Sequence, residues 1–159
     1  MDDRLLDYDE VLQVCFVTDD LDRSLAWFGD LTGKAPVHVG DWATSDPETD
    51  IHDGGPGRFT YRLGLFRFGA LDLEFLQPGP EPSTWRDELE ARGPCFHHLG
   101  IRTRDMTRRA AHMEEKGLPL IQSGEFDGKN GRYAYFDGKT QMGAILELLE
   151  WDRDKEPQP

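Results

Sequence analysis

The sequence contains little that would tie the protein to a membrane or to an oxidising compartment. Cys15 and Cys95 are its only cysteines, too few for a disulfide framework, and we expect each to serve as a small buried hydrophobe. No apolar run approaches the ~18 residues that cross a bilayer. The first residues, Met-Asp-Asp-Arg, lack the basic-then-apolar order of a secretory signal. We therefore predict a cytoplasmic protein that does not act at a membrane.

Basic residues are also scarce. The chain has 18 Lys and Arg against 31 Asp and Glu, for a formal net charge of −13. Such a charge repels phosphate backbones, so nucleic acid is excluded as a partner. A small anionic substrate remains compatible, because a local basic patch can outweigh the overall charge. With 37% hydrophobic residues, including nine Phe, the chain can build one packed domain over 1–159.

The order of predicted elements is the most informative feature. The first half predicts a strand at 11–18, a helix from 21 to Gly33, a strand at 35–39, a long polar loop at 40–57, and a hairpin of strands at 59–68 and 71–76. The second half predicts a strand at 95–103, a helix at 105–116, a strand at 118–122, a Gly-rich loop at 123–131, and a hairpin of strands at 132–137 and 144–150. Both halves thus read β-α-β-β-β.

Matching residues support this internal repeat. A constant offset of 85 aligns the first strand and helix of each half, an offset of 74 aligns residues 57–61 with 131–135, and an offset of 73 aligns Glu74-Phe75-Leu76 with Glu147-Leu148-Leu149. We predict an α+β fold of two tandem βαβββ modules at about 10–77 and 94–151. A linker helix at about 78–93 joins them.

The repeat brings four potential metal ligands to two kinds of position. Gln13 aligns with His98 on the first strands, and Glu74 aligns with Glu147 on the last strands. If a pseudo-twofold axis relates the modules, the four side chains converge on one point. One imidazole, two carboxylates and one amide oxygen suit a divalent ion such as Zn, Ni, Co or Mn. Taken singly, the two glutamates would more often be solvated strand-face carboxylates.

Alternation of side chains along a strand decides between the adjacent histidines. Successive residues point to opposite faces, so only one of His97 and His98 can face the site. The repeat selects His98, because Gln13 is its counterpart. We therefore expect His97 on the opposite face, in a structural or supporting role.

These motifs resemble the vicinal oxygen chelate superfamily, over roughly residues 10–151. The run Phe96-His97-His98-Leu99-Gly100 is similar to its His-His-aliphatic-Gly strand motif, and Glu147 and Glu74 stand in its Leu-Glu-Leu and Leu-Glu-Phe-Leu-Gln-Pro motifs. The resemblance implies a cup-shaped mixed sheet around one metal held by Gln13, Glu74, His98 and Glu147. The ligand set resembles that of metal-dependent glyoxalases, whereas the linker at 83–100 is more similar to the epimerases.

What the resemblance implies about function is proton transfer next to a carbonyl, with Glu147 as both ligand and base. We predict a metal-dependent isomerase, epimerase or lyase acting on a small, CoA- or thiol-linked substrate. A glyoxalase-type lactoylglutathione lyase and a non-catalytic drug-binding protein are alternatives. An extradiol dioxygenase fits poorly, because Gln13 replaces a histidine. Proteins of this fold commonly form homodimers, so a homodimer is expected.

One departure bears on the substrate. Epimerases of this superfamily need a second acid/base carboxylate from the middle strands of the first module, and residues 59–65 contain no Asp or Glu. Four acidic residues of the 40–57 loop could substitute: Asp46, Glu48, Asp50 and Asp53.

Overall fold

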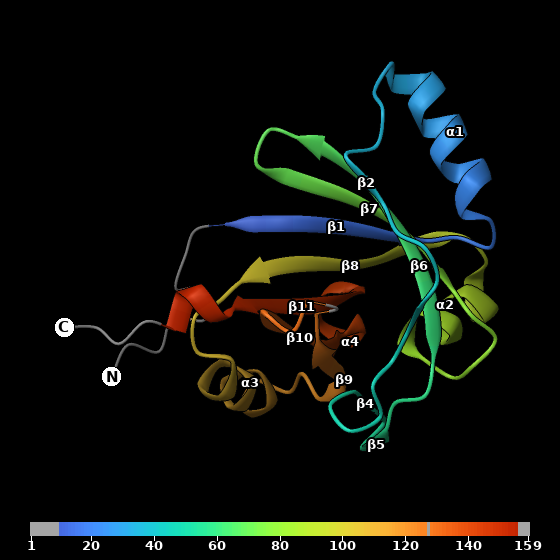
Figure 1. The fold of residues 1–159 in the computed structure, drawn as a ribbon. Helices are drawn as coiled ribbons and strands as arrows, with labels where there is room; N and C mark the ends of the chain where they lie inside the picture. Colours follow the sequence, from blue (N-terminus) through green and yellow to red (C-terminus); the bar gives the residue numbers. More distant parts are fainter. Residues whose placement is uncertain (1–9, 127, 156–159) are drawn as a thin grey trace.

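The structure, a computed structural model, describes residues 10–126 and 128–155. It contains one large, curved, mixed sheet with helices packed against it (Figure 1). The predicted α+β class is confirmed. Residues 1–9 and 156–159, which the prediction included in the domain, lie outside the described residues.

The elements follow the predicted order, with additions. The first half contains β1 (Val11–Val17), α1 (Leu21–Thr32), β2 (His38–Val39), β3 (Ala43–Thr44), β4 (Ile51–His52), β5 (Gly55–Pro56), β6 (Thr60–Phe68) and β7 (Leu71–Pro78). The link is α2 (Thr84–Arg92). The second half contains β8 (Cys95–Arg102), α3 (Met106–Glu115), β9 (Leu120–Glu125), β10 (Gly131–Gly138), α4 (Lys139–Met142), β11 (Ala144–Trp151) and a 3₁₀ turn (Asp152–Lys155).

Short polar side chains begin the main helices as the sequence predicts. Asp20 and Ser83 accept hydrogen bonds from backbone N–H groups in the first turns of α1 and α2. Such caps satisfy N–H groups that have no partner within the helix. Gly33, at φ 66°, ends α1 in the left-handed conformation that glycine adopts without strain. The strand expected at 35–39 is shorter, because only residues 38–39 pair with β6.

The sheet preserves the repeat in its central strands. Their order is β7-β1-β8-β11, with β1 antiparallel to β8 and each first strand parallel to the last strand of its own half. Each residue pair between β1 and β7 has an equivalent pair between β8 and β11. The residue numbers in the equivalent pair are higher by 85 for β1 and by 73 for β7. For example, Gln13–Asp72 is equivalent to His98–Ile145, and Cys15–Glu74 to Gly100–Glu147. The central strands are therefore related by a pseudo-twofold axis.

The predicted offset of 74 between the middle strands is wrong. Leu65 pairs with Glu74, and Tyr135 pairs with Glu147. Because the two glutamates correspond, Leu65 corresponds to Tyr135, at an offset of 70. Hairpin register is set by the connection between the strands. The β10–β11 connection contains α4, whereas residues 69–70 join β6 to β7.

The segment predicted as a loop at 40–57 is a strap between the two open edges of the sheet, and we use this name below. Its β3 pairs with β6 near one edge, and its β4 pairs with β9 at the other. In Figure 1 it runs from the end of β2 down to β4 and β5 beside β9. The strap thus joins the first half of the chain to the outermost strand of the second.

Apolar packing on both faces of the sheet fixes its curvature. Under α1, Leu21 and Leu25 pack with Phe66, and under α3, Met113 packs with Phe136 and Leu148. On the inner face a separate cluster surrounds the buried Trp85 of α2; it includes Cys15, Val17, Phe59, Leu76, Tyr133, Tyr135 and Leu149. Within the described part of the chain, no helix has the length and apolar character needed to span a bilayer.

Candidate metal centre

The four predicted ligands come from four neighbouring strands. Gln13 lies on β1, Glu74 on β7, His98 on β8 and Glu147 on β11. Relative exposure is 0% for His98, 5% for Glu74 and 3% for Glu147. Carboxylates are rarely buried to this extent without a partner. The central strands therefore bury His98 and both glutamates, while Gln13 is partly exposed.

Successive short contacts connect the four side chains. Gln13 Nε2 donates a hydrogen bond to Glu74 Oε2 over 2.6 Å. The carboxylate of Glu74 and the ring of His98 offer ligand atoms within 4.8 Å of each other. His98 Nε2 lies 3.1 Å from Glu147 Oε2. Each predicted ligand is thus close to at least one other, although Glu147 does not belong to the tightest group.

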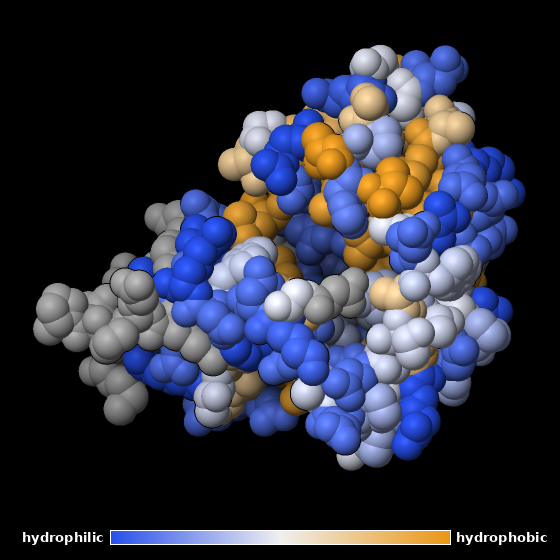
Figure 2. All heavy atoms as spheres, in the orientation of Figure 1, coloured by the Kyte–Doolittle hydropathy of each residue, from blue (hydrophilic) through white to orange (hydrophobic). Residues whose placement is uncertain are grey.

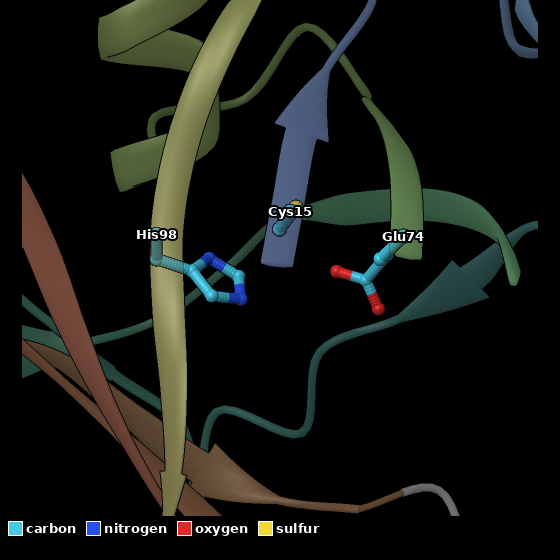
Figure 3. Close-up of side chains that lie close together, drawn as sticks. All are labelled: Cys15, Glu74 and His98. Atoms are coloured by element: carbon cyan, nitrogen blue, oxygen red, sulfur yellow. The ribbon is translucent and has the colours of Figure 1, made fainter. Parts of the chain in front are cut away.

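Cys15 is a group near the centre that the sequence reasoning treated only as a buried hydrophobe. Its sulfur lies within 4.8 Å of ligand atoms of Glu74 and His98, and Figure 3 shows these two side chains pointing toward each other with Cys15 between their strands. Cys15 pairs with Glu74 on one side and His98 on the other. Its position two residues after Gln13, on the same strand face, was the available signal.

The face predicted for His97 is wrong, because β8 is not regular. Cys15 pairs with His98 while Phe16 pairs with Phe96, so His97 is the extra residue of a β-bulge. A bulge interrupts the alternation of side chains and redirects them. His97 Nδ1 lies 2.9 Å from His98 Nδ1, and His97 is 1% exposed. The two rings are in contact instead of on opposite faces.

Burial and charge set the protonation of this cluster. Burial raises the pKa of Glu74 to about 7, the charge of His98 lowers it and that of Glu147 raises it. Burial also lowers the pKa of His97 well below its usual range, which keeps that ring neutral. For His98, burial favours the neutral ring, but the charges of Glu147 and Glu74 outweigh it and raise its pKa.

A neutral His97 has one ring nitrogen that can accept a hydrogen bond from Nδ1 of His98. Between two Nδ1 atoms one must donate and the other accept. If His97 accepts, His98 carries its proton on Nδ1 and leaves Nε2, the atom nearest Glu147, as a lone-pair donor. This is the usual way in which a metal-binding histidine is oriented.

A cavity of about 480 Å³ opens above these residues. Figure 2 shows this face of the molecule hollowed near its centre, with hydrophobic side chains beside the hollow. Apolar residues such as Leu63, Leu76 and Trp151 line the cavity with Gln13, Glu74 and Glu147. Three arginines also line it: Arg67, Arg102 and Arg153. The cavity can hold a small molecule with an apolar body and an anionic group.

The residues present fit a divalent metal. His98 Nε2 and Glu147 Oε2 are buried, and among the described residues each has the other, 3.1 Å away, as its polar contact. Imidazole nitrogen and carboxylate oxygen are both metal ligands, and a divalent ion would bind the two atoms in place of this contact. The donor set of imidazole nitrogen, carboxylate oxygens and an amide oxygen suits Zn, Ni, Co or Mn. Gln13, Glu74, His98 and Glu147 are the residues that would hold the ion.

Solved structures with the same fold include methylmalonyl-CoA epimerases. The enzyme from Mycobacterium tuberculosis has a TM-score of 0.63 and 22% identity, with 94% of this chain and 88% of that chain covered. A methylmalonyl-CoA epimerase in complex with methylmalonyl-CoA and NH4+ has a TM-score of 0.66 and 20% identity, with 92% and 97% covered. A hypothetical protein from Bacillus halodurans C-125 has a TM-score of 0.67 and 16% identity, with 94% and 96% covered. At these identities the likeness shows the fold.

Sequence comparison gives the family. Comparison with curated proteins finds no match. Residues 12–136 match the family described as Glyoxalase/Bleomycin resistance protein/Dioxygenase superfamily, which confirms the resemblance inferred from the motifs. This chain belongs to the glyoxalase/bleomycin resistance protein/dioxygenase superfamily.

Proposed function

We propose that the protein is a divalent-metal-dependent isomerase or epimerase that moves a proton at the carbon next to a carbonyl group. The observation that carries the proposal is the buried pair of His98 Nε2 and Glu147 Oε2, which lie 3.1 Å apart beside a cavity that Glu147 lines. A bound divalent ion would supply a Lewis acid that polarises the substrate carbonyl.

The surrounding residues have two proposed roles, orienting the ligands and accepting the proton. Gln13 hydrogen-bonds the Glu74 carboxylate, and His97 orients the ring of His98, so these groups form a preorganised ligand set. Glu147 is the proposed base, because it is a buried carboxylate that lines the cavity and its Oε2 lies 3.1 Å from the ring of His98. The buried rings of Trp85 and Tyr135 line the same cavity as this carboxylate.

The second acid/base group must line the same cavity as Glu147. The carboxylates suggested from the 40–57 loop do not line the cavity, whereas Asp72 and Glu125 do. Asp72 is engaged by Arg67 through hydrogen bonds from its guanidinium. We therefore assign Glu125 of β9 as the second proton-transfer group. An epimerase needs two such groups, one for each face of the reacting carbon.

An anionic thioester is the substrate class that the cavity supports best. Three arginines line the cavity of this acidic protein. Arg67 and Arg102 donate hydrogen bonds to Asp72 and Asp154, with which a substrate anion would compete. The guanidinium carbon of Arg153 lies 5.6 Å from the centre of the Trp151 ring. Guanidinium groups bind carboxylates and phosphates in a forked geometry. Such a cavity fits an acyl-CoA with a carboxylate next to the reacting carbon. A glutathione adduct, the substrate of the glyoxalase alternative, also carries carboxylates.

Solvent exchange tests this proposal directly. The metal-loaded protein is incubated in deuterated water with 2-acyl thioesters of CoA, and deuterium at the α-carbon is measured by mass spectrometry. We expect exchange that depends on metal and on Glu147. Turnover of methylglyoxal plus glutathione without exchange of the thioesters would establish the glyoxalase alternative. Absence of both activities and of stoichiometric metal would favour the ligand-binding alternative and refute the enzyme.

A further inference from the structure

A second group of metal-ligating side chains lies outside the cavity, where the strap meets α2. His52 is the last residue of β4, Asp53 follows it, and Asp87 lies in the first turn of α2. His52 Nε2 lies 3.6 Å from Asp53 Oδ2 and 3.5 Å from Asp87 Oδ2. None of these residues lines the cavity of the candidate metal centre.

The histidine is buried and its nitrogen has no hydrogen-bond partner. The His52 side chain is 10% exposed, and within the described residues Nε2 finds no donor or acceptor at hydrogen-bond geometry. The carboxylates of Asp53 and Asp87 are 69% and 59% exposed. A buried nitrogen therefore points at two carboxylates that solvent and ions can reach, an arrangement that is unfavourable without a further partner.

The distances from His52 Nε2 to the two carboxylates match the spacing of ligands around one ion. Zinc binds imidazole nitrogen and carboxylate oxygen at about 2.0–2.2 Å, so the edges of a tetrahedral site measure about 3.3–3.6 Å. The two distances from His52 Nε2 fall in this range, and all three ligand atoms lie within 4.8 Å of one another. Direct hydrogen bonds would have required distances near 2.9 Å.

We propose that His52, Asp53 and Asp87 form a second divalent-cation site, separate from the floor of the cavity. One imidazole and two carboxylates suit zinc or a similar ion, with water completing the coordination. This proposal does not depend on the proposed function, because it uses no residue of the candidate metal centre.

The ion would bind where the end of the strap meets β9 and α2, and would stabilise the position of the strap. His52 pairs with Gln122 of β9, and Asp53 N donates a hydrogen bond to Ile121 O over 3.0 Å. Thr84 N, at the start of α2, donates to Gln122 Oε1 over 2.9 Å. The strap end, β9 and α2 thus already meet here. A bound ion adds a link between the strap and α2 that joins the two edges of the sheet more firmly.

Titration of the metal-free protein with zinc alone tests the proposal. We expect two ions per wild-type chain by calorimetry, and one ion in His52→Ala and in Asp87→Asn. Because Asp87 is exposed, Asp87→Asn keeps the fold if His52→Ala does not. Glu90→Gln, an exposed carboxylate one turn later on the same helix, is the matched control and should retain both ions.

Two further variants separate this site from the cavity. His98→Ala should retain one ion, and zinc should raise its melting temperature by several degrees, since binding to the folded state alone stabilises it. The double variant His98→Ala/Asp87→Asn should bind no ion, and zinc should not raise its melting temperature. A wild-type stoichiometry that Asp87→Asn and His52→Ala leave unchanged would overturn the proposal. If wild type binds one ion that is lost in Asp87→Asn but kept in His98→Ala, this site stands and the proposed catalytic centre fails.

Discussion

The two halves of the sheet contain a β-bulge at equivalent positions, but the bulged residues are different. In β1, Val11 pairs with Ile101 and Gln13 with Gly100, so Leu12 is an extra, bulged residue. In β8 the bulged residue is His97, which is 85 positions later. Each bulge comes immediately before a proposed ligand, Gln13 or His98. Bulges next to functional sites redirect side chains, so the backbone supports two equivalent ligand positions.

The side chains at equivalent positions are unlike. Leu12 lines the cavity, whereas its counterpart His97 contacts the ring of His98. Cys15 corresponds to Gly100, and the buried Val17 corresponds to Arg102. The symmetric backbone therefore supplies the geometry of the site, and asymmetric substitutions supply its chemistry. Substitutions at paired positions test this division.

The two glutamates should give the largest difference. Glu147→Gln removes the proposed base and should lower the rate of α-deuterium exchange about 10²–10⁴-fold, the usual contribution of a positioned base. Glu74→Gln removes a ligand carboxylate from the equivalent position and should mainly weaken metal binding, so added metal restores part of the rate. Exchange rates at saturating zinc measure both.

Glu114→Gln, on the outer helix α3, is the control that should leave exchange unchanged. If Glu74→Gln abolishes exchange at saturating metal while Glu147→Gln does not, the base comes from the first half and our assignment is wrong.

The proximity of the four proposed ligands could be predicted from the sequence because it depends on the most regular part of the fold. Four central strands with fixed offsets of 85 and 73 bring Gln13, Glu74, His98 and Glu147 together. The contact between His97 and His98 could not be predicted in the same way. Regular alternation separates adjacent side chains, and a bulge depends on how β8 pairs with a strand 85 residues away.

The two bulges give the second prediction. His97→Leu makes the second half like the first and removes the partner of His98 Nδ1. Loss of such a supporting hydrogen bond typically costs about 10–100-fold in metal affinity. Calorimetry with zinc measures the loss. His97→Asn, whose side-chain oxygen can accept the same proton, should restore part of the affinity. Equal affinities for wild type and His97→Leu would show that His97 only fills space.

A smaller effect is expected at Gly100, the counterpart of Cys15. A Cβ there would lie 3.0 Å from Oε2 of Glu147 and 3.0 Å from Cβ of Gln13. Gly100→Ala should therefore crowd the proposed ligands and cost about 1–3 kcal/mol of unfolding free energy, as overpacking does. Denaturant unfolding measures this cost. Cys15→Ser conserves volume at the equivalent position and serves as the comparison; a larger loss in Cys15→Ser would contradict the steric interpretation.

The outer parts of the fold were the least predictable from sequence. The segment at 40–57 looked like a polar loop, because β3, β4 and β5 are two residues each and show no periodicity. Their pairing depends on the edges of a sheet formed by distant strands, as does the offset of 70 between β6 and β10. Short edge strands take their structure from their neighbours more than from their own sequence.

The smallest predicted effect is on melting temperature. It comes from comparing one ion pair in each half of the chain. Asp154 accepts hydrogen bonds from Arg102 Nη2 over 2.7 Å and from Nε over 3.2 Å, and its side chain is 6% exposed. The hydrogen bonds from Arg102 lower the pKa of Asp154 below its ordinary value of 3.8. A lowered pKa adds stability above the unfolded-state value, and this contribution is lost as the pH falls through the folded-state value.

Asp154→Asn should therefore lower the melting temperature at pH 7 by a few degrees, equivalent to about 1 kcal/mol. The gap between variant and wild type should close as the pH falls below 3.8 and the wild-type carboxylate becomes protonated. Asp22 receives a similar two-pronged contact from Arg62, at 3.0 Å for each bond, but its side chain is 76% exposed. Solvent screens such a pair, so Asp22→Asn should produce no measurable gap. Equal gaps for the two variants, or a gap for Asp154→Asn that does not shrink as the pH falls below 3.8, would show that burial of the carboxylate does not distinguish the ion pairs of the two halves.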